Sequence, residues 1–185
     1  MKARSAGLSL LLLAAAATPA RAESVGQAPR YTHGEVFVGI YAHDVDSPLN
    51  LRGFGEGTDF QLGWRGTRMR SLSAIGSPSP HLFVAVNTGG DAHYAVAGIS
   101  WRIGGRVYAR PGIGLAVHTA DGRDSPTPER SLGSRVLFAP ELALGVELGE
   151  RVSIEASLVH LSHATLLGEH NPGMDNVGVR LNYRF

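Results

Sequence analysis

Three side chains near the end of the chain have the types and spacing needed to activate a hydroxyl group. His160 and Ser162 stand two positions apart, and Asp175 follows thirteen positions after the serine. A serine hydroxyl becomes a useful nucleophile when an imidazole takes its proton, and a carboxylate improves that base by fixing its tautomer and stabilising its protonated form. Residues at i and i+2 share one face of a β-strand, so the first two side chains meet if this segment is extended.

The chain begins with a segment that is typical of a secretory signal. Lys2 and Arg4 precede an apolar run from Leu8 to Ala17, and Ala20-Arg21-Ala22 forms an A-x-A cleavage site. We therefore predict a leader over residues 1–22 and one mature domain over residues 23–185. The leader holds three basic residues and no acidic one, so its removal lowers the formal net charge from +1 to −2.

Composition excludes several kinds of chemistry. The sequence has no cysteine, which rules out disulfides, thiolate metal sites and a cysteine nucleophile. The negative mature charge argues against nucleic-acid binding. Histidines elsewhere in the chain lack metal-ligand spacing, so we predict no metal.

Alternation of apolar and polar residues at period two recurs along nearly the whole mature chain, with glycine- or proline-bearing turns between the runs. This pattern predicts antiparallel strands joined as hairpins. The runs number eight: Glu35–Asp44, Asp59–Gly66, His81–Asn87, His93–Arg102, Arg106–His118, Arg135–Leu148, Arg151–Ser162 and Asn176–Phe185.

The last predicted strand separates two kinds of side chain. Odd positions from Val177 to Phe185 are apolar, whereas even positions from Asn176 to Arg184 are polar or glycine. A membrane barrel turns its apolar face to lipid, and a soluble barrel turns it inward. The secretory signal and the aromatic residue at the chain end favour the membrane version. We therefore predict an all-β fold, an eight-stranded antiparallel transmembrane β-barrel in the bacterial outer membrane.

This barrel places the three reactive side chains together. With both termini in the periplasm, the seventh strand runs outward, so His160 and Ser162 lie near the external rim on the lipid-facing side. Asp175 opens the neighbouring strand on the same face. Two connections depart from the usual pattern of short periplasmic turns and long outer loops: Thr67–Pro80 is long and Thr88–Ala92 is short. Either the strand boundaries there are wrong or the rim is irregular.

The segment His160-Leu161-Ser162-His163-Ala164, followed by Asn171-Pro172-Gly173-Met174-Asp175, resembles the outer-membrane lipid A 3-O-deacylase family, often called PagL. The family motif has a His-x-Ser-Asn-Ala core, then an Asn, a Gly and an acidic residue. The resemblance covers about the last 30 residues of this chain.

The resemblance implies Ser162 as nucleophile, His160 as general base and Asp175 as orienting acid. It also implies that Asn171 supports the oxyanion hole. The acid is usually Glu in the family, so Glu169 is the reserve acid, and His163 stands where the family usually has Asn.

The activity that the resemblance implies is a serine esterase that hydrolyses an ester-linked hydroxyacyl chain of lipopolysaccharide in the outer leaflet. Lipid A is then the substrate, outer-membrane lipid surrounds the protein, and no cofactor is needed. A homodimer is compatible with the resemblance. Two alternatives stay open: a non-catalytic structural or adhesive barrel, and an outer-membrane phospholipase.

Charged residues on other strands have a structural interpretation. An eight-stranded barrel is just wide enough for side chains to fill. We therefore predict that a polar network fills the interior, formed by Arg65, Arg102, Arg110, Glu141, Glu147 and Glu155.

Overall fold

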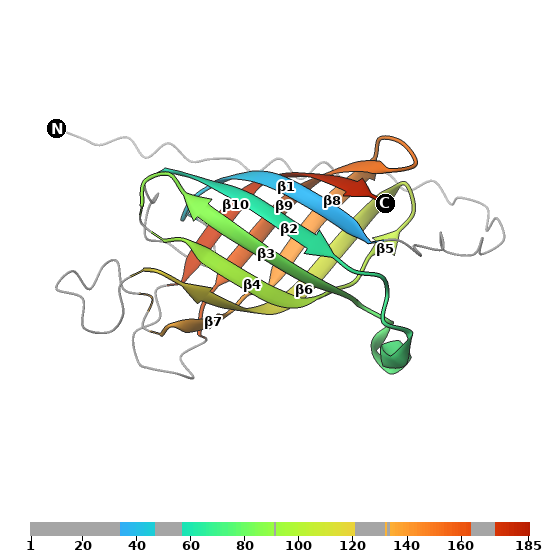
Figure 1. Cartoon of the computed structure of the whole chain (residues 1–185), viewed down its shortest axis with the longest axis horizontal. Helices are drawn as coiled ribbons and strands as arrows, with labels where there is room; N and C mark the ends of the chain where they lie inside the picture. The colour runs from blue at the N-terminus through green and yellow to red at the C-terminus, as the bar shows by residue number, and fades with distance from the viewer. Residues whose placement is uncertain (1–33, 47–56, 91, 121–131, 133, 164–172) are drawn as a thin grey trace, which may run out of the picture.

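The computed structural model describes residues 34–46, 57–90, 92–120, 132, 134–163 and 173–185 (Figure 1). The predicted leader over residues 1–22 lies outside these ranges. No helix within them is long and apolar enough to span a membrane. Apart from a 3-10 helix, η1 (Arg70–Ile75), their regular structure consists of strands: β1 (Glu35–Ala42), β2 (Thr58–Arg65), β3 (Ser79–Asn87), β4 (Tyr94–Ser100), β5 (Ile103–Gly104), β6 (Val107–His118), β7 (Val136–Phe138), β8 (Glu141–Glu147), β9 (Val152–Leu161) and β10 (Met174–Arg184).

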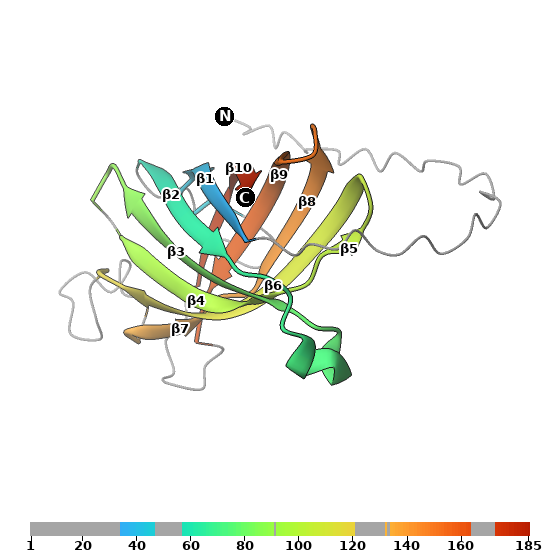
Figure 2. The same ribbon diagram turned by 45° about the vertical axis from the view of Figure 1, so that its right-hand side comes forward.

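The strands form a closed antiparallel barrel, which Figure 2 shows as a curved wall. Their order is β4-β3-β2-β1-β10-β9-β8-β6, and pairing of β4 with β6 closes the ring. The predicted eight-stranded barrel is confirmed, with β5 as a short extra arm beside β6. We call the end that holds Glu35 and Arg184 the terminal rim. The opposite end, where β9 finishes and β10 begins, is the site rim.

The sixth predicted strand, Arg135–Leu148, is interrupted once. Ala139 and Pro140 separate β7 from β8. Both pieces pair with β6 in the same register. Phe138 of β7 lies opposite Leu115, and Glu141 of β8 lies opposite Gly112, so no residue is skipped on either strand. Proline has no N–H to donate to a strand ladder. The ladder is therefore broken at Pro140, although the path of the chain is not.

The direction of the side chains decides between a membrane barrel and a soluble one. On β10, Val179 and Leu181 are 46% and 48% exposed, whereas Arg180 and Asn182 are each 1% exposed. The same alternation continues on the other strands, so the barrel has an apolar outer wall, and its buried charged residues lie inside beside a cluster of buried apolar side chains. Such a wall is stable in hydrocarbon and not in water. The membrane version predicted from the sequence is confirmed.

Ion pairs and aromatic rings fill the interior. Arg180 Nη1 donates to Glu141 Oε2 at 2.9 Å, and the Arg180 guanidinium carbon lies 4.9 Å from the centre of the Phe37 ring. Closer to the terminal rim, Arg110 Nε donates to Glu155 Oε1 at 2.8 Å. The predicted polar network is therefore present. Removing one partner of such a buried pair costs about 3–5 kcal/mol, because the other charge is left without compensation.

The two unusual connections reflect an irregular rim and not misplaced strands. β2 and β3 have the predicted positions, and the long connection between them, at the terminal rim, contains η1 (Figure 2). The helix ends at Gly76, whose φ of +86° lies in the left-handed region that glycine adopts without strain. Trp101 Nε1 donates to the carbonyl of Ile75 at 2.6 Å and fastens the helix to the barrel.

Candidate active site

The register between β9 and β10 brings the predicted base and acid face to face. Asp175 lies directly opposite His160. His160 Nδ1 and Asp175 Oδ1 are 2.6 Å apart, and the two side chains are 17% and 0% exposed, respectively. Short contacts of this kind are typical of charge-assisted hydrogen bonds. The carboxylate is therefore sequestered from water while the imidazole still reaches the surface.

This hydrogen bond determines which nitrogen of His160 is available as a base. An ionised carboxylate only accepts hydrogen bonds, so Nδ1 must be the nitrogen that donates to Asp175. In the neutral ring the lone pair then resides on Nε2. The arrangement matches the pairing of base and orienting acid in a catalytic triad.

Ser162 follows β9 on the same outer face as His160. Its side chain is half-buried, whereas the flanking residues Leu161 and His163 are buried and belong to the inward-facing positions. Side chains at i and i+2 on one strand face start roughly 6.5–7 Å apart and can lean into contact. The structure thus presents a hydroxyl, an imidazole and a carboxylate on one outward patch, as the sequence indicates.

A second strand holds the backbone of this patch from the other side. The His160 amide donates to the carbonyl of Pro140 at 3.0 Å. Phe138 and Ser162 form a β-bridge in which each amide donates to the other carbonyl, at 2.7 and 3.1 Å. The reactive residues are therefore held by backbone hydrogen bonds to the interrupted strand. No pattern in the sequence indicates this role of the Pro140 break.

Gly173 is a second residue whose role the sequence did not reveal. Its φ is +72°, and a Cβ built there would lie 3.1 Å from Cε1 of His160. A side chain at this position would press against the imidazole edge and strain the backbone. The Asn-Pro-Gly segment was a signal for the turn, but only the structure shows that the glycine faces the ring.

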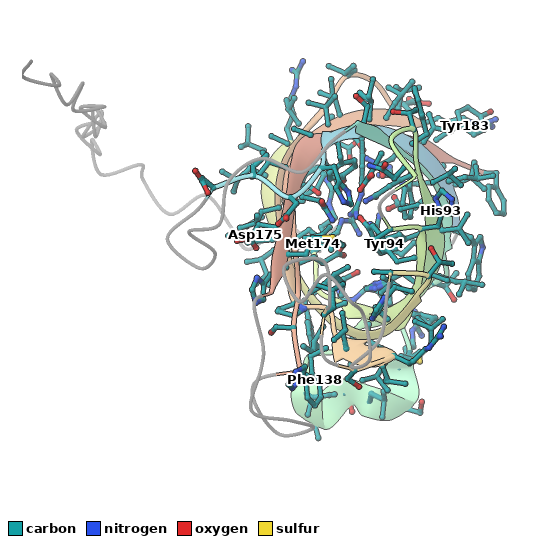
Figure 3. All side chains as sticks on the ribbon, turned by 90° about the vertical axis from the view of Figure 1, so that its left-hand side faces the viewer. His93, Tyr94, Phe138, Met174, Asp175 and Tyr183 are labelled. Atoms are coloured by element: carbon teal, nitrogen blue, oxygen red, sulfur yellow. The ribbon has the colours of Figure 1, made fainter. Side chains whose placement is uncertain are left out.

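The start of β10 is anchored by the segment that follows β1. The Val45 amide donates to the Asp175 carbonyl at 2.7 Å, and the Asp44 amide donates to Asn176 Oδ1 at 2.9 Å. Asn176 Nδ2 in turn donates to the Tyr94 hydroxyl inside the barrel at 3.1 Å. Figure 3 looks into the barrel from the site rim, with Tyr94 inside the ring of strands and Asp175 at the wall. Asp175 is thereby held from the side of β1 as well as from the side of β9, where it pairs with His160.

Two predicted site residues lie outside the described ranges. Asn171, the candidate for oxyanion support, and Glu169, the reserve acid, both belong to the segment 164–172. Their roles stay predictions. Within the described ranges, no group of three or more His, Asp or Glu side chains is arranged to hold a metal ion.

Comparisons with known proteins agree with this architecture. The family model described as "Lipid A 3-O-deacylase (PagL)" matches residues 53–184, a range that includes His160, Ser162 and Asp175. The crystal structure of the outer membrane enzyme PagL is similar with a TM-score of 0.60 and 17% identity, covering 82% of this chain and 99% of that one.

Two further barrels show the same fold. Neisserial surface protein A is similar with a TM-score of 0.53 and 10% identity, covering 82% of this chain and 97% of that one. A structure from the de novo design of transmembrane β-barrels gives a TM-score of 0.52 and 7% identity, with coverages of 83% and 96%. At such identities these structures show the fold alone. No curated protein sequence matches the chain significantly.

Proposed function

Because the chain belongs to the lipid A 3-O-deacylase (PagL) family, it is a lipid A deacylase of the outer membrane, and we propose that it acts as a serine esterase. Ser162 is the nucleophile, His160 the general base and Asp175 the orienting acid. The observation that carries the proposal is the 2.6 Å hydrogen bond between His160 and Asp175 on the outer face that also bears Ser162.

The reaction proceeds in two steps. His160 Nε2 takes the proton of Ser162 as Oγ attacks the ester carbonyl, and the tetrahedral intermediate collapses when the sugar oxygen leaves with that proton. Water then attacks the acyl-serine, with His160 again accepting and returning a proton. Asp175 stabilises the protonated imidazole in both steps. All three groups come from one chain, so this chemistry needs no second copy.

The outward position of the site suits a substrate that stays in the membrane. With the leader over residues 1–22 removed and both termini in the periplasm, the site rim faces the cell exterior, where lipopolysaccharide resides. Outward-facing Phe138 lies beside Ser162, Leu115 lies beside Phe138 on the next strand, and together they offer an apolar surface to an acyl chain. The ester then lies at the membrane interface, where polar side chains are tolerated.

The oxyanion that forms during attack needs hydrogen-bond donors. Asn171 is the proposed donor, by its place in the motif. Between the two candidate acids, the contact of Asp175 with His160 supports Asp175 over Glu169.

Mass spectrometry of lipid A from expressing cells tests the proposal. The wild-type protein should remove one hydroxyacyl chain, and Ser162→Ala should leave lipid A intact. Ser73→Ala is a matched control, because Ser73 is an exposed serine on η1 at the opposite rim. Heat-dependent migration in gels checks that each variant forms a barrel.

The outcomes separate the alternatives. Intact lipid A with fatty acid released from phospholipid would indicate a phospholipase. Intact lipid A and no fatty-acid release from a folded wild type would indicate a structural or adhesive barrel. Unchanged deacylation by Ser162→Ala would refute the assignment of the nucleophile.

A further inference from the structure

A cavity opens at the terminal rim, far from the candidate active site. It has a volume of about 300 Å³ and is lined in part by the residues on either side of η1. Its walls come from the end of β2, from β6, from the segment 100–104 and from the end of β10. We call it the mouth cavity. Neither the proposed esterase chemistry nor the family match assigns it a role.

Positive charge dominates this cavity. Glu35 is the one carboxylate in its lining, and two more, Glu147 and Glu155, pair with lining arginines from just outside it. The arginines in the lining number five and outnumber these carboxylates by two; they are Arg65, Arg68, Arg102, Arg110 and Arg184.

The three carboxylates are already engaged. Glu147 Oε1 lies 2.6 Å from Arg102 Nη2 and 2.8 Å from Arg184 Nη2. Arg110 Nη2 lies 3.0 Å from Glu35 Oε1, and Arg110 Nε donates to Glu155 at 2.8 Å. Each of the three carboxylates is therefore paired with at least one arginine, although Glu147 Oε2 and Glu155 Oε2 accept no hydrogen bond among the described residues.

Two arginines keep donor capacity beyond these pairs. Arg65 is 1% exposed, and although it pairs with Glu35, its Nε has no hydrogen-bond partner among the described residues. Arg68 donates to the carbonyls of Ser77 and Gly76 at 3.1 and 2.9 Å, which neutralises none of its charge. A buried donor without a partner is costly, so a ligand that supplies an acceptor would be stabilised here.

We propose that the mouth cavity binds a phosphate group, either as free phosphate or as the headgroup of an anionic phospholipid. Guanidinium groups match phosphate oxygens in geometry and in charge. A volume of about 300 Å³ is ample for a phosphate, since one water occupies about 30 Å³ of liquid. Trp101 and Ile103 at the cavity edge provide apolar surface for the glycerol end of a lipid.

Titration of the folded protein in a non-ionic maltoside detergent tests this site. Inorganic phosphate is added in one series and phosphatidylglycerol in another, with ³¹P NMR and calorimetry as readouts. Binding should be saturable, and Arg68→Gln should weaken it about tenfold, as expected for the loss of one charge-assisted hydrogen bond. Arg68→Lys should restore part of the affinity because it keeps the charge.

Arg151→Gln is the matched control. Arg151 is an exposed arginine at the same rim, in the turn between β8 and β9, and does not line the cavity. Saturable binding of both ligands or of phosphate alone supports a free anion as ligand, and binding of the lipid alone supports the headgroup. Absence of saturable binding in both series, or equal weakening by Arg151→Gln, overturns the proposal. Deacylation should be unaffected by Arg68→Gln, because Arg68 lies at the rim opposite the candidate active site, so the result is independent of the esterase assignment.

Discussion

Replacing Gly173 by alanine should impair catalysis through one contact with the base. The alanine Cβ would lie 3.1 Å from Cε1 of His160, so the imidazole must retreat by a few tenths of an ångström. That movement lengthens or bends the 2.6 Å hydrogen bond to Asp175 and so changes the orientation of the base. Misplacement of a catalytic group by about 1 Å costs about a hundredfold in rate, so this smaller shift should lower kcat/KM about tenfold.

A backbone effect must be separated from this contact. The φ of Gly173 is +72°, and an alanine forced into the left-handed region costs roughly 1–2 kcal/mol of stability. Gly90→Ala supplies the control, because Gly90 has a φ of +79° and a Cβ there would meet nothing within 4 Å. The two variants should lose similar free energies of unfolding, and only Gly173→Ala should lose activity.

The assay combines two measurements on the same refolded samples. Urea unfolding reports the free energy, and hydroxyacyl release from lipid A in mixed micelles reports kcat/KM. Equal activities of Gly173→Ala and Gly90→Ala would refute the claim that the His160 position limits the reaction. A larger loss of stability in Gly173→Ala with unchanged activity per folded molecule would refute it as well.

Three further substitutions probe the site and the barrel. Asp175→Asn should lower kcat about a thousandfold or more with little effect on folding, because a neutral amide does not stabilise the protonated imidazole of His160. The rate of serine acylation in a single turnover measures this effect. Glu141→Gln should destabilise the barrel by about 3–5 kcal/mol in urea unfolding, because Arg180 stays buried beside it without a counter-charge. Phe138→Ala should raise KM several-fold and leave the free energy of unfolding within about 0.5 kcal/mol, since it removes lipid-facing surface beside Ser162 and no interior contact. Initial rates over a range of lipid A mole fractions measure the change in KM.

Most of the fold could be predicted because apolar and polar residues alternate along each of the eight strands of the barrel. Alternation alone is symmetric, however: it shows that Val179 and Arg180 face opposite ways but not which one faces outward. The secretory signal favoured the membrane version, and the exposure of the two side chains decides it. The break at Pro140 has no alternation signal, since the register on both sides continues unshifted.

The candidate site could be predicted as a set of residues but not as a geometry. Residues at every second position of a strand lie on the same face of the sheet, so His160, Ser162 and Asp175 could be assigned to one face from the sequence. The direct opposition of Asp175 and His160 depends on the register between β9 and β10, which the intervening loop length does not determine. The contact of Gly173 with the imidazole depends on a left-handed backbone angle that the residue type permits but does not require.

The outward-facing site changes what substrate concentration means for this protein. A hydrolase with an enclosed pocket meets its substrate by diffusion in three dimensions, whereas a reactive patch on a lipid-facing wall meets neighbours that diffuse laterally within one leaflet. The quantity that sets the rate is therefore the mole fraction of substrate in the lipid layer and not its molarity in the bulk. Adding inert detergent at constant bulk substrate should slow the reaction in proportion to this dilution, although neither protein nor substrate has become scarcer.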